Sequence, residues 1–294
     1  MFHHPVLLEP FLSFFSSKEI HTFVDATVGA AGHSYRLLET HPEIKKLYGI
    51  DQDKEALDRS AEILKPFGSR VELIRGNFRE IDRCLAVNQV DGILFDLGVS
   101  SMQLDQSSKG FSLYKEGPLD MRMNEAQPLD AATVVNTFSE KELGRIFREY
   151  GEEPRWRKAA KAIVEGRKKK KITTTIELTE LLKRVLTWGG RRGKRIHPAT
   201  LVFQALRIYV NDELGAIEEA LPKAIALLSP GGRLGVIAFH SLEDRIVKQT
   251  FNRFAREEKT VHLLTKKVIQ ADRAEIKNNP RSRSAKMRFV EKKF

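Results

Sequence analysis

Residues 25–33 read Asp25-Ala-Thr-Val-Gly29-Ala-Ala-Gly32-His33 and lead from a short apolar run into a polar segment of helical pattern. Small residues at such a strand-to-helix turn let the backbone approach a ligand closely. In an open α/β sheet, ligands bind outside the carboxyl ends of the strands, and this turn lies at such an end. The stretch therefore predicts a parallel sheet with a ligand site at its edge.

Outward from this turn, apolar runs of strand length alternate with amphipathic runs such as Lys54–Leu64. This alternation is typical of βαβ units, and it predicts an α/β fold in which a mostly parallel sheet carries helices on both faces. The strands that we expect are Thr22–Thr27, Lys46–Ile50, Arg70–Ile74, Asp91–Leu97, Arg233–His240, Val261–Val268 and Lys286–Val290.

Between about Asp105 and His197 the strand pattern stops, and charged helical segments replace it. The helices expected there are Glu140–Tyr150, Pro154–Lys171 and Thr175–Leu186. A long helical run from Pro198 to Leu228, with a break near Pro222, and a turn at Ser229–Gly232 lead back into the sheet pattern. The sequence therefore predicts a discontinuous sheet domain, residues 1–104 and 198–294, with an inserted helical domain, residues 105–197.

Composition narrows the class of protein and its partners. The chain is 41% hydrophobic and 30% charged, which is typical of a soluble globular protein. A net charge of +11 favours a polyanionic partner such as nucleic acid. The single Cys84 excludes an intramolecular disulfide and fits a reducing compartment, so we expect a cytoplasmic location. Neither a signal peptide nor an apolar stretch near the ~20 residues of a membrane span is evident, so we expect no membrane partner.

The ends of the second, third and fourth strands carry side chains suited to an adenosine cofactor. Asp51 follows the second strand, 22 positions after Gly29, where a carboxylate can accept hydrogen bonds from both ribose hydroxyls. Asp53 is the neighbouring alternative. Phe78 follows the third strand, where an aromatic ring can pack on adenine, and Asp96 ends the fourth.

The glycine pattern of the first turn separates two classes of cofactor. A nicotinamide dinucleotide is typically bound by G-x-G-x-x-G, whereas this turn reads Gly29-Ala30-Ala31-Gly32. A pyrophosphate cradle is therefore disfavoured, and with it an NAD-linked oxidoreductase. S-adenosylmethionine needs the ribose acid and the adenine contact but no phosphate loop, so it is the cofactor that we expect.

Motifs along nearly the whole chain resemble those of the bacterial 16S rRNA (cytosine-N4)-methyltransferases. Besides residues 25–34, the matching stretches are His4–Leu7, Gly49–Asp51, Asp91–Asp105, Gly110–Ser112, Gly117–Met123, Tyr150–Glu153, His197–Thr200, Phe203–Ile208, Phe239–Arg245 and Asn279–Lys286. The resemblance implies a Rossmann-type methyltransferase sheet with an inserted helical domain that helps to hold RNA. It also implies methyl transfer from S-adenosylmethionine to the N4 amine of a cytosine in the decoding region of 16S rRNA.

The resemblance further implies which residues contact the cofactor. Carried over position by position, they are Ala31, Gly32, His33, Asp51, Phe78, Asp96 and Gln103. This chain departs from the family at Ala31, where a glycine is usual, and at Lys109, where an arginine is usual. An alanine methyl at a close backbone approach weakens cofactor binding unless φ stays negative at that position.

Two residues are candidates for the chemistry. Asp96 either accepts an N–H of the target amine or only holds the cofactor, and the sequence leaves both roles open. His240, at the end of the strand Arg233–His240, either faces the target base or is a structural histidine bonded to a backbone carbonyl. Because the histidines show no ligand spacing and there is one cysteine, we expect no catalytic metal.

Three basic clusters are candidates for RNA contact, namely Arg167–Lys171, Arg191–Arg195 and Arg281–Arg288. Two other functions remain open at the level of sequence. One is a ribosome-assembly factor that has lost catalysis, which the change at Ala31 favours. The other is a methyltransferase that acts on DNA or protein.

Overall fold

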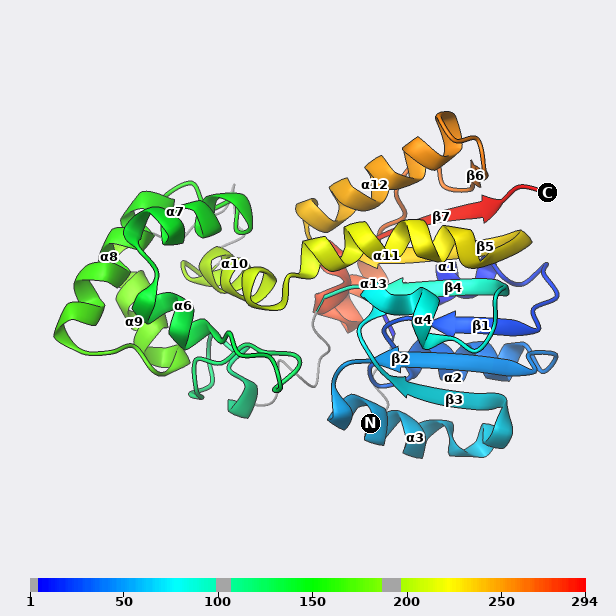
Figure 1. The fold of residues 1–294 in the computed structure, drawn as a ribbon, viewed down its shortest axis with the longest axis horizontal. Coiled ribbons are helices and arrows are strands. Elements are labelled where there is room, and N and C mark those ends of the chain that lie inside the picture. Colours follow the sequence, from blue (N-terminus) through cyan, green and yellow to red (C-terminus); the bar gives the residue numbers. More distant parts are fainter. Residues whose placement is uncertain (1–4, 99–106, 187–196) are drawn as a thin grey trace. The chain divides into compact units, whose positions relative to one another are not determined.

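The computed structural model describes residues 5–98, 107–186 and 197–294. It divides the chain into two compact units, residues 1–98 with 214–294 and residues 99–213, here called the sheet unit and the helical unit (Figure 1). We expected the domain boundaries at 104/105 and 197/198, whereas the two units divide at 98/99 and 213/214. The helix α10, Thr200–Asn211, packs on helices of the helical unit, whereas we had assigned it to the sheet domain.

The sheet unit is built on one seven-stranded sheet of order β3-β2-β1-β4-β5-β7-β6. β1 to β5 pair in parallel, and β7 pairs antiparallel with both β5 and β6. This arrangement confirms the predicted mostly parallel α/β sheet. The strands are β1 (Thr22–Asp25), β2 (Lys46–Asp51), β3 (Val71–Arg75), β4 (Val90–Asp96), β5 (Leu228–Ala238), β6 (Val261–Leu263) and β7 (Lys286–Lys292).

Helices cover both faces of the sheet (Figure 1). One core joins the strands to α4, α11 and α12, and the other joins them to α1, α2 and α3. Neighbouring residues of β5 divide between these cores, since Val236 lies in the first and Ile237 in the second. The helices are α1 (Leu8–Ser13), α2 (Gly32–Thr40), α3 (Lys54–Leu64), α4 (Ile81–Cys84), α11 (Glu213–Leu227) and α12 (Ser241–Arg256), with α13 (Arg273–Asn278) and the short 3-10 turns η1 (Lys65–Arg70), η2 (Phe78–Glu80) and η4 (Pro280–Ser284).

The middle of the sheet depends on a glycine in β4. A Cβ built at Gly92 would lie 2.6 Å from the ring of Phe23 on the neighbouring β1. That ring meets Phe11 and Phe15 edge-on, at centroid distances of 6.1 and 5.4 Å. The glycine therefore makes room for an aromatic cluster between the sheet and the N-terminal helix α1.

The helical unit contains η3 (Ser107–Lys109), α6 (Ala131–Thr137), α7 (Glu140–Glu149), α8 (Trp156–Lys169), α9 (Thr175–Val185) and α10. A capping box begins α7, because the Ser139 hydroxyl accepts from the Glu142 N–H while the Glu142 carboxylate accepts from the Ser139 N–H. Thr174 and Glu177 form a second such box at the start of α9. Fully buried side chains such as Phe147 and Leu182 form the core of the helical unit.

Three local expectations are wrong. The run from Pro198 breaks at Asp212, which has φ +47 and ends α10, while Pro222 lies inside α11. The turn at Ser229–Gly232 is a bulge within β5, because four residues of β5 lie opposite the single residue Asp91 of β4 between the pairs Val90–Leu228 and Gly92–Arg233. The sixth strand is three residues long, since β6 ends at Leu263.

Within the described ranges, no helix is long and apolar enough to cross a membrane.

Candidate cofactor and active site

The turn after β1 is a tight loop stabilised by the strand beside it. Gly29 has φ +51, which favours glycine, and its N–H donates to Asp51 Oδ2 over 3.0 Å. The Val28 N–H donates to the Ile50 carbonyl of β2. The turn predicted from residues 25–33 is therefore fixed to the carboxyl end of β2, next to the expected ribose acid.

Ala31 adopts the left-handed conformation that we had named as unfavourable. Its φ is +56, its methyl group is fully buried, and it is the residue just before α2. An L-residue other than glycine there costs roughly 1–2 kcal/mol, which burial of the methyl group partly offsets. The condition under which the substitution would be harmless, a negative φ, is not met.

Gly32 is the first residue of α2, and the N-terminal segment packs against it. A Cβ at Gly32 would lie 2.7 Å from Cγ of Pro5. The first N–H groups of a helix lack intrahelical partners, so the start of α2 favours an anionic group such as a carboxylate. The Ala31 N–H donates to the Val28 carbonyl, so the backbone N–H groups that remain for the expected cofactor contact are those of Gly32 and His33, while the His33 side chain points back into the protein.

Asp51 ends β2 and both its oxygens accept backbone N–H groups, Oδ1 that of Asp53 over 2.9 Å and Oδ2 that of Gly29. Burial raises the pKa of Asp51 to about 6, although these hydrogen bonds oppose the shift. Asp53, the alternative ribose acid, caps α3 by accepting the Glu55 N–H over 3.1 Å. The geometry therefore favours Asp51 for the ribose.

A third carboxylate, Asp25, belongs to the same edge, and we had not singled it out. It ends β1, is 2% exposed, and accepts from the Ser34 hydroxyl over 2.6 Å and from the Thr27 N–H. Burial raises the pKa of Asp25 to about 6. A sequence signal was available, since the residue begins the turn motif, but its burial was not readable from spacing.

The segment after β3 supplies the aromatic side chain. Phe78 begins η2 and is partly buried, with its ring edge-on to Phe95 of β4 at a centroid distance of 5.5 Å. Asn77 precedes it and accepts the Arg79 N–H over 3.0 Å. The ring is therefore held at the carboxyl end of β3 by both core packing and a local cap.

Asp96 ends β4, and its two carboxylate oxygens differ in their contacts. Its N–H donates to Thr27 Oγ1 over 2.6 Å, and Oδ2 lies 3.5 Å from His33 Nδ1. Oδ1 is buried and has no hydrogen-bond partner among the residues that the structure describes. Burial, followed by the nearby carboxylates of Asp25 and Glu243, raises the pKa of Asp96 well above its ordinary value. Such a group is typical of functional sites.

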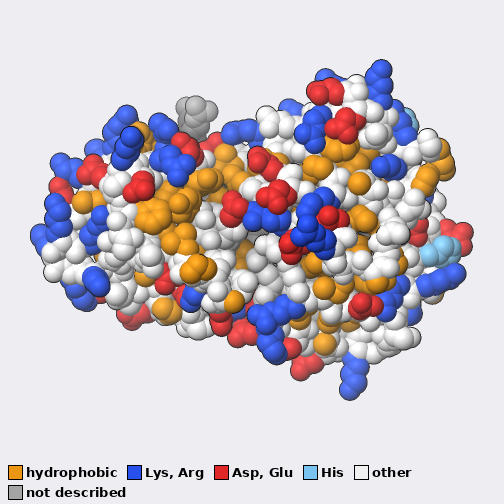
Figure 2. Space-filling model, viewed as in Figure 1, with side chains coloured by type: hydrophobic (Ala, Val, Ile, Leu, Met, Phe, Trp, Pro, Cys, Tyr) orange, Lys and Arg blue, Asp and Glu red, His pale blue; other side chains and the backbone are white. Residues whose placement is uncertain are grey.

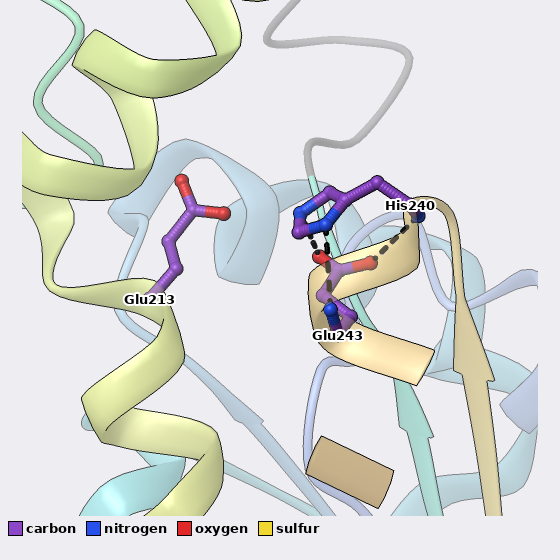
Figure 3. Close-up of side chains that lie close together, drawn as sticks. All are labelled: Glu213, His240 and Glu243. Carbon is purple, nitrogen blue, oxygen red and sulfur yellow. Dashed lines mark hydrogen bonds and ion pairs between the residues drawn. The ribbon is translucent and has the colours of Figure 1, made fainter. Parts of the chain in front are cut away.

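His240 begins α12 as its N-cap (Figure 3). Its Nδ1 accepts the Glu243 N–H over 3.3 Å, so Nε2 carries the proton, and Nε2 lies 3.0 Å from Glu243 Oε1. Glu243 is fully buried, and its Oε2 accepts the N–H groups of Phe239 and His240. His240 thus accepts a backbone N–H at the start of α12 instead of contacting the carbonyl that we considered, and its contact with the target base stays a prediction.

Some of the expected residues fall outside the described ranges or belong to the helical unit. Gln103 and the cluster Arg191–Arg195 fall outside the described residues. Lys109 is buried within the helical unit, 6% exposed. Glu213, also drawn in Figure 3, forms two hydrogen bonds of 2.8 Å with Arg207.

Comparison with known proteins agrees with the resemblance. The model of the MraW methylase family matches residues 1–293. Three relatives carry the name Ribosomal RNA small subunit methyltransferase H. The protein of Persephonella marina is 49% identical over 293 residues, with 99% of each chain covered. That of Chlamydia caviae is 49% identical over 292 residues (99% of this chain, 98% of the relative), and that of Symbiobacterium thermophilum is 45% identical over 311 (99% and 97%). The chain belongs to the MraW methylase family.

Proposed function

We propose that this protein transfers a methyl group from S-adenosylmethionine to the exocyclic N4 amine of a cytosine in the decoding region of 16S rRNA. The observation that carries the proposal is the family match over the full chain, in which relatives named for the small ribosomal subunit share 45–49% of their residues. The cytosine and its N4 amine follow from the family resemblance. The residues at the carboxyl ends of the strands are the candidates for binding the cofactor and for the chemistry of transfer.

The side chains at this edge fit a cationic nucleoside. Asp25, Asp51 and Asp96 end three neighbouring strands, and burial raises the pKa of each. Buried carboxylates are costly unless a positive group offsets them. The sulfonium and the ammonium of S-adenosylmethionine are two such groups.

Each part of the ligand has a candidate partner. Asp51 would accept the ribose hydroxyls, Phe78 would pack on adenine, and the backbone N–H groups of Gly32 and His33 at the start of α2 would hold the methionine carboxylate. When bound, S-adenosylmethionine supplies a methyl group activated by its sulfonium. The protein's contribution is to position the amine opposite the departing sulfur.

Asp96 is the candidate for contact with the amine. The lone pair of the N4 amine is delocalised into the cytosine ring, which makes the amine a weak nucleophile. An oxygen that accepts its N–H localises that pair and stabilises the positive charge that develops on nitrogen. The Asp96 side chain is 27% exposed, and its Oδ1 has no hydrogen-bond partner among the described residues.

Binding of S-adenosylmethionine is expected to strengthen as the pH rises from 5 to 7. The pKa values of Asp25 and Asp51 are about 6, so these groups are largely protonated at pH 5 and ionised at pH 7. A cation favours the ionised forms, so by linkage the dissociation constant should fall roughly tenfold or more over this range. Calorimetry at several pH values measures it.

S-adenosylhomocysteine is the matched control because it lacks the sulfonium charge. Its dissociation constant should change less over the same pH range. Equal pH dependence of both ligands would mean that the carboxylates do not interact with the sulfonium.

We expect the lysines and arginines that contact RNA to lie outside residues 1–98. Residues 1–98 carry 11 Lys and Arg against 15 Asp and Glu, whereas residues 99–213 carry 22 against 15. Figure 2 shows these side chains interspersed with acidic ones on the face in view. The variants that test RNA contact are therefore chosen from individual exposed lysines.

The cluster Arg167–Lys171 divides into two kinds of residue. Arg167 donates to the Val135 carbonyl, and Lys170 pairs with Glu177 over 2.5 Å. Lys168, Lys169 and Lys171 are exposed. In Arg281–Arg288, both Lys286 and Arg288 pair with Asp244.

Changing Lys168, Lys169 and Lys171 together to Gln should weaken RNA binding without affecting the cofactor. Each lost phosphate contact lowers the slope of log affinity against log salt by about 0.7–0.9. Filter binding at several salt concentrations measures this slope. Lys170→Gln is the control, since its charge is already paired, and a triple variant with an unchanged slope would remove this cluster from the RNA surface.

Transfer of tritiated methyl groups to 30S subunits, free 16S RNA and DNA in parallel, followed by nucleoside analysis, tests the function. N4-methylcytosine in 16S RNA is the expected product. Label in DNA alone would assign a different substrate, and cofactor binding without any transfer would favour an assembly factor.

A further inference from the structure

We propose that the His33 side chain is a positioning residue for Asp96, because its ring holds the orientation of this carboxylate at the end of β4. This inference rests on the proposed function. It assigns to the imidazole a role separate from the backbone contact that the family resemblance implies for residue 33.

The imidazole of His33 is held on two sides. The side chain is 6% exposed, and the ring meets Phe11 edge-on at a centroid distance of 5.3 Å. Its Nε2 lies 2.9 Å from the Val6 carbonyl oxygen. Because a carbonyl can only accept a hydrogen bond, Nε2 carries a proton, and Nδ1 is the nitrogen turned toward Asp96.

The Val6 carbonyl is itself fixed by contacts from both ends of the chain. The next N–H, that of Leu7, donates to Glu275 of α13 over 2.7 Å. Leu7 has φ +55, and Pro5 packs where a side chain at Gly32 would lie. The N-terminal segment therefore orients the ring that contacts Asp96.

The two carboxylate oxygens of Asp96 therefore have different surroundings. Oδ2 faces His33 Nδ1 at 3.5 Å, and Oδ1 has none among the described residues. The other charged groups that face Asp96 are Asp25 at the end of β1 and Glu243 on α12, both of the same sign. Within the described part of the chain, the ion-pair contact of Asp96 comes from His33 alone.

The pair can share one proton without losing its geometry. If Asp96 is ionised, a protonated Nδ1 donates to Oδ2. If Asp96 is protonated on Oδ2, a neutral Nδ1 accepts from it. In both states the ring faces Oδ2 at the ion-pair distance of 3.5 Å and keeps the orientation of the carboxylate.

Two amide variants separate the contacts of the ring. The amide nitrogen of Asn occupies roughly the place of Nδ1, and that of Gln the place of Nε2. His33→Asn therefore keeps a donor toward Asp96, whereas His33→Gln keeps only the contact with Val6. Single-turnover transfer to the RNA substrate should fall about tenfold to a hundredfold in the Gln variant and less than about fivefold in the Asn variant. The KM for S-adenosylmethionine should change by less than about threefold in both.

A measurement without turnover accompanies the kinetics. The Asp96 carboxyl carbon in ¹³C-labelled protein, identified by comparison with Asp96→Asn, should titrate at a different pKa in His33→Gln than in the wild type, because the ring that exchanges a proton with the carboxyl group has been removed. Thermal unfolding identifies any variant that fails to fold.

The outcomes separate the inference from the proposed function. Equal transfer rates in wild type and His33→Gln would overturn the inference, as would an unchanged Asp96 titration. Equal losses in the Asn and Gln variants, accompanied by lost cofactor affinity, would assign His33 to structure only and would also overturn it. Wild-type protein that binds S-adenosylmethionine but methylates no RNA would instead contradict the proposed function.

Discussion

Replacement of Asp96 by Ala is expected to abolish methyl transfer, with a single-turnover rate lowered by roughly 10²–10⁴-fold. The physical reason is that the Asp96 carboxylate, which ends β4 and is 27% exposed, would accept the N–H of the target amine, and Ala offers no acceptor there. Rapid-quench measurement of methyl transfer with enzyme in excess checks the rate. A rate close to that of the wild type would remove Asp96 from the chemistry.

Cofactor affinity distinguishes the two roles that the sequence left open for Asp96. Asp96→Asn keeps the shape of the side chain and removes its charge. A large loss of rate with nearly unchanged affinity for S-adenosylmethionine would assign Asp96 to the amine. A loss of affinity equal to the loss of rate would assign it to the cofactor alone.

Asp51→Asn is expected to weaken S-adenosylmethionine binding by about tenfold to a hundredfold, the equivalent of one or two charge-assisted hydrogen bonds. The carboxylate both holds the Gly29 turn and would accept the ribose hydroxyls. Asn retains the acceptor for one backbone N–H but presents an NH₂ group to the other. Calorimetry with S-adenosylhomocysteine as a second ligand checks the result, and both ligands should weaken because they share the ribose.

Asp53→Asn is the matched control for this experiment. Asp53 lies two residues further on and caps α3, a position at which Asn serves as well as Asp. Its effect on affinity should be within about threefold. If both substitutions weakened binding equally, the loop as a whole and not the Asp51 carboxylate would determine affinity.

Much of the sheet could be predicted because its signals are local. The helix Lys54–Leu64 has the predicted bounds, since apolar residues at helical spacing follow a capping aspartate. Asp51 and Asp96 follow from a general rule, because the carboxyl ends of parallel strands meet at one edge of the sheet.

The errors come from features that depend on tertiary packing. The pattern of α10 identifies a helix but does not show which of the two units buries it. The bulge in β5 is invisible in Ser229–Gly232, which reads as a turn until β4 pairs on either side of it. The contact between His33 and Asp96 joins positions 63 residues apart through the order of the strands, so spacing alone could not indicate it.

The interruption between β4 and β5 affects how the protein is made. β4 ends at residue 96, but its parallel neighbour β5 begins at residue 228. During synthesis, β1 to β4 are therefore complete well before β5 has been translated. At about 5–20 residues per second, translation of the intervening segment takes on the order of ten seconds. During that interval the unpaired edge of β4 is open to pairing with other chains, so aggregation of the nascent chain is the hazard that the interruption creates.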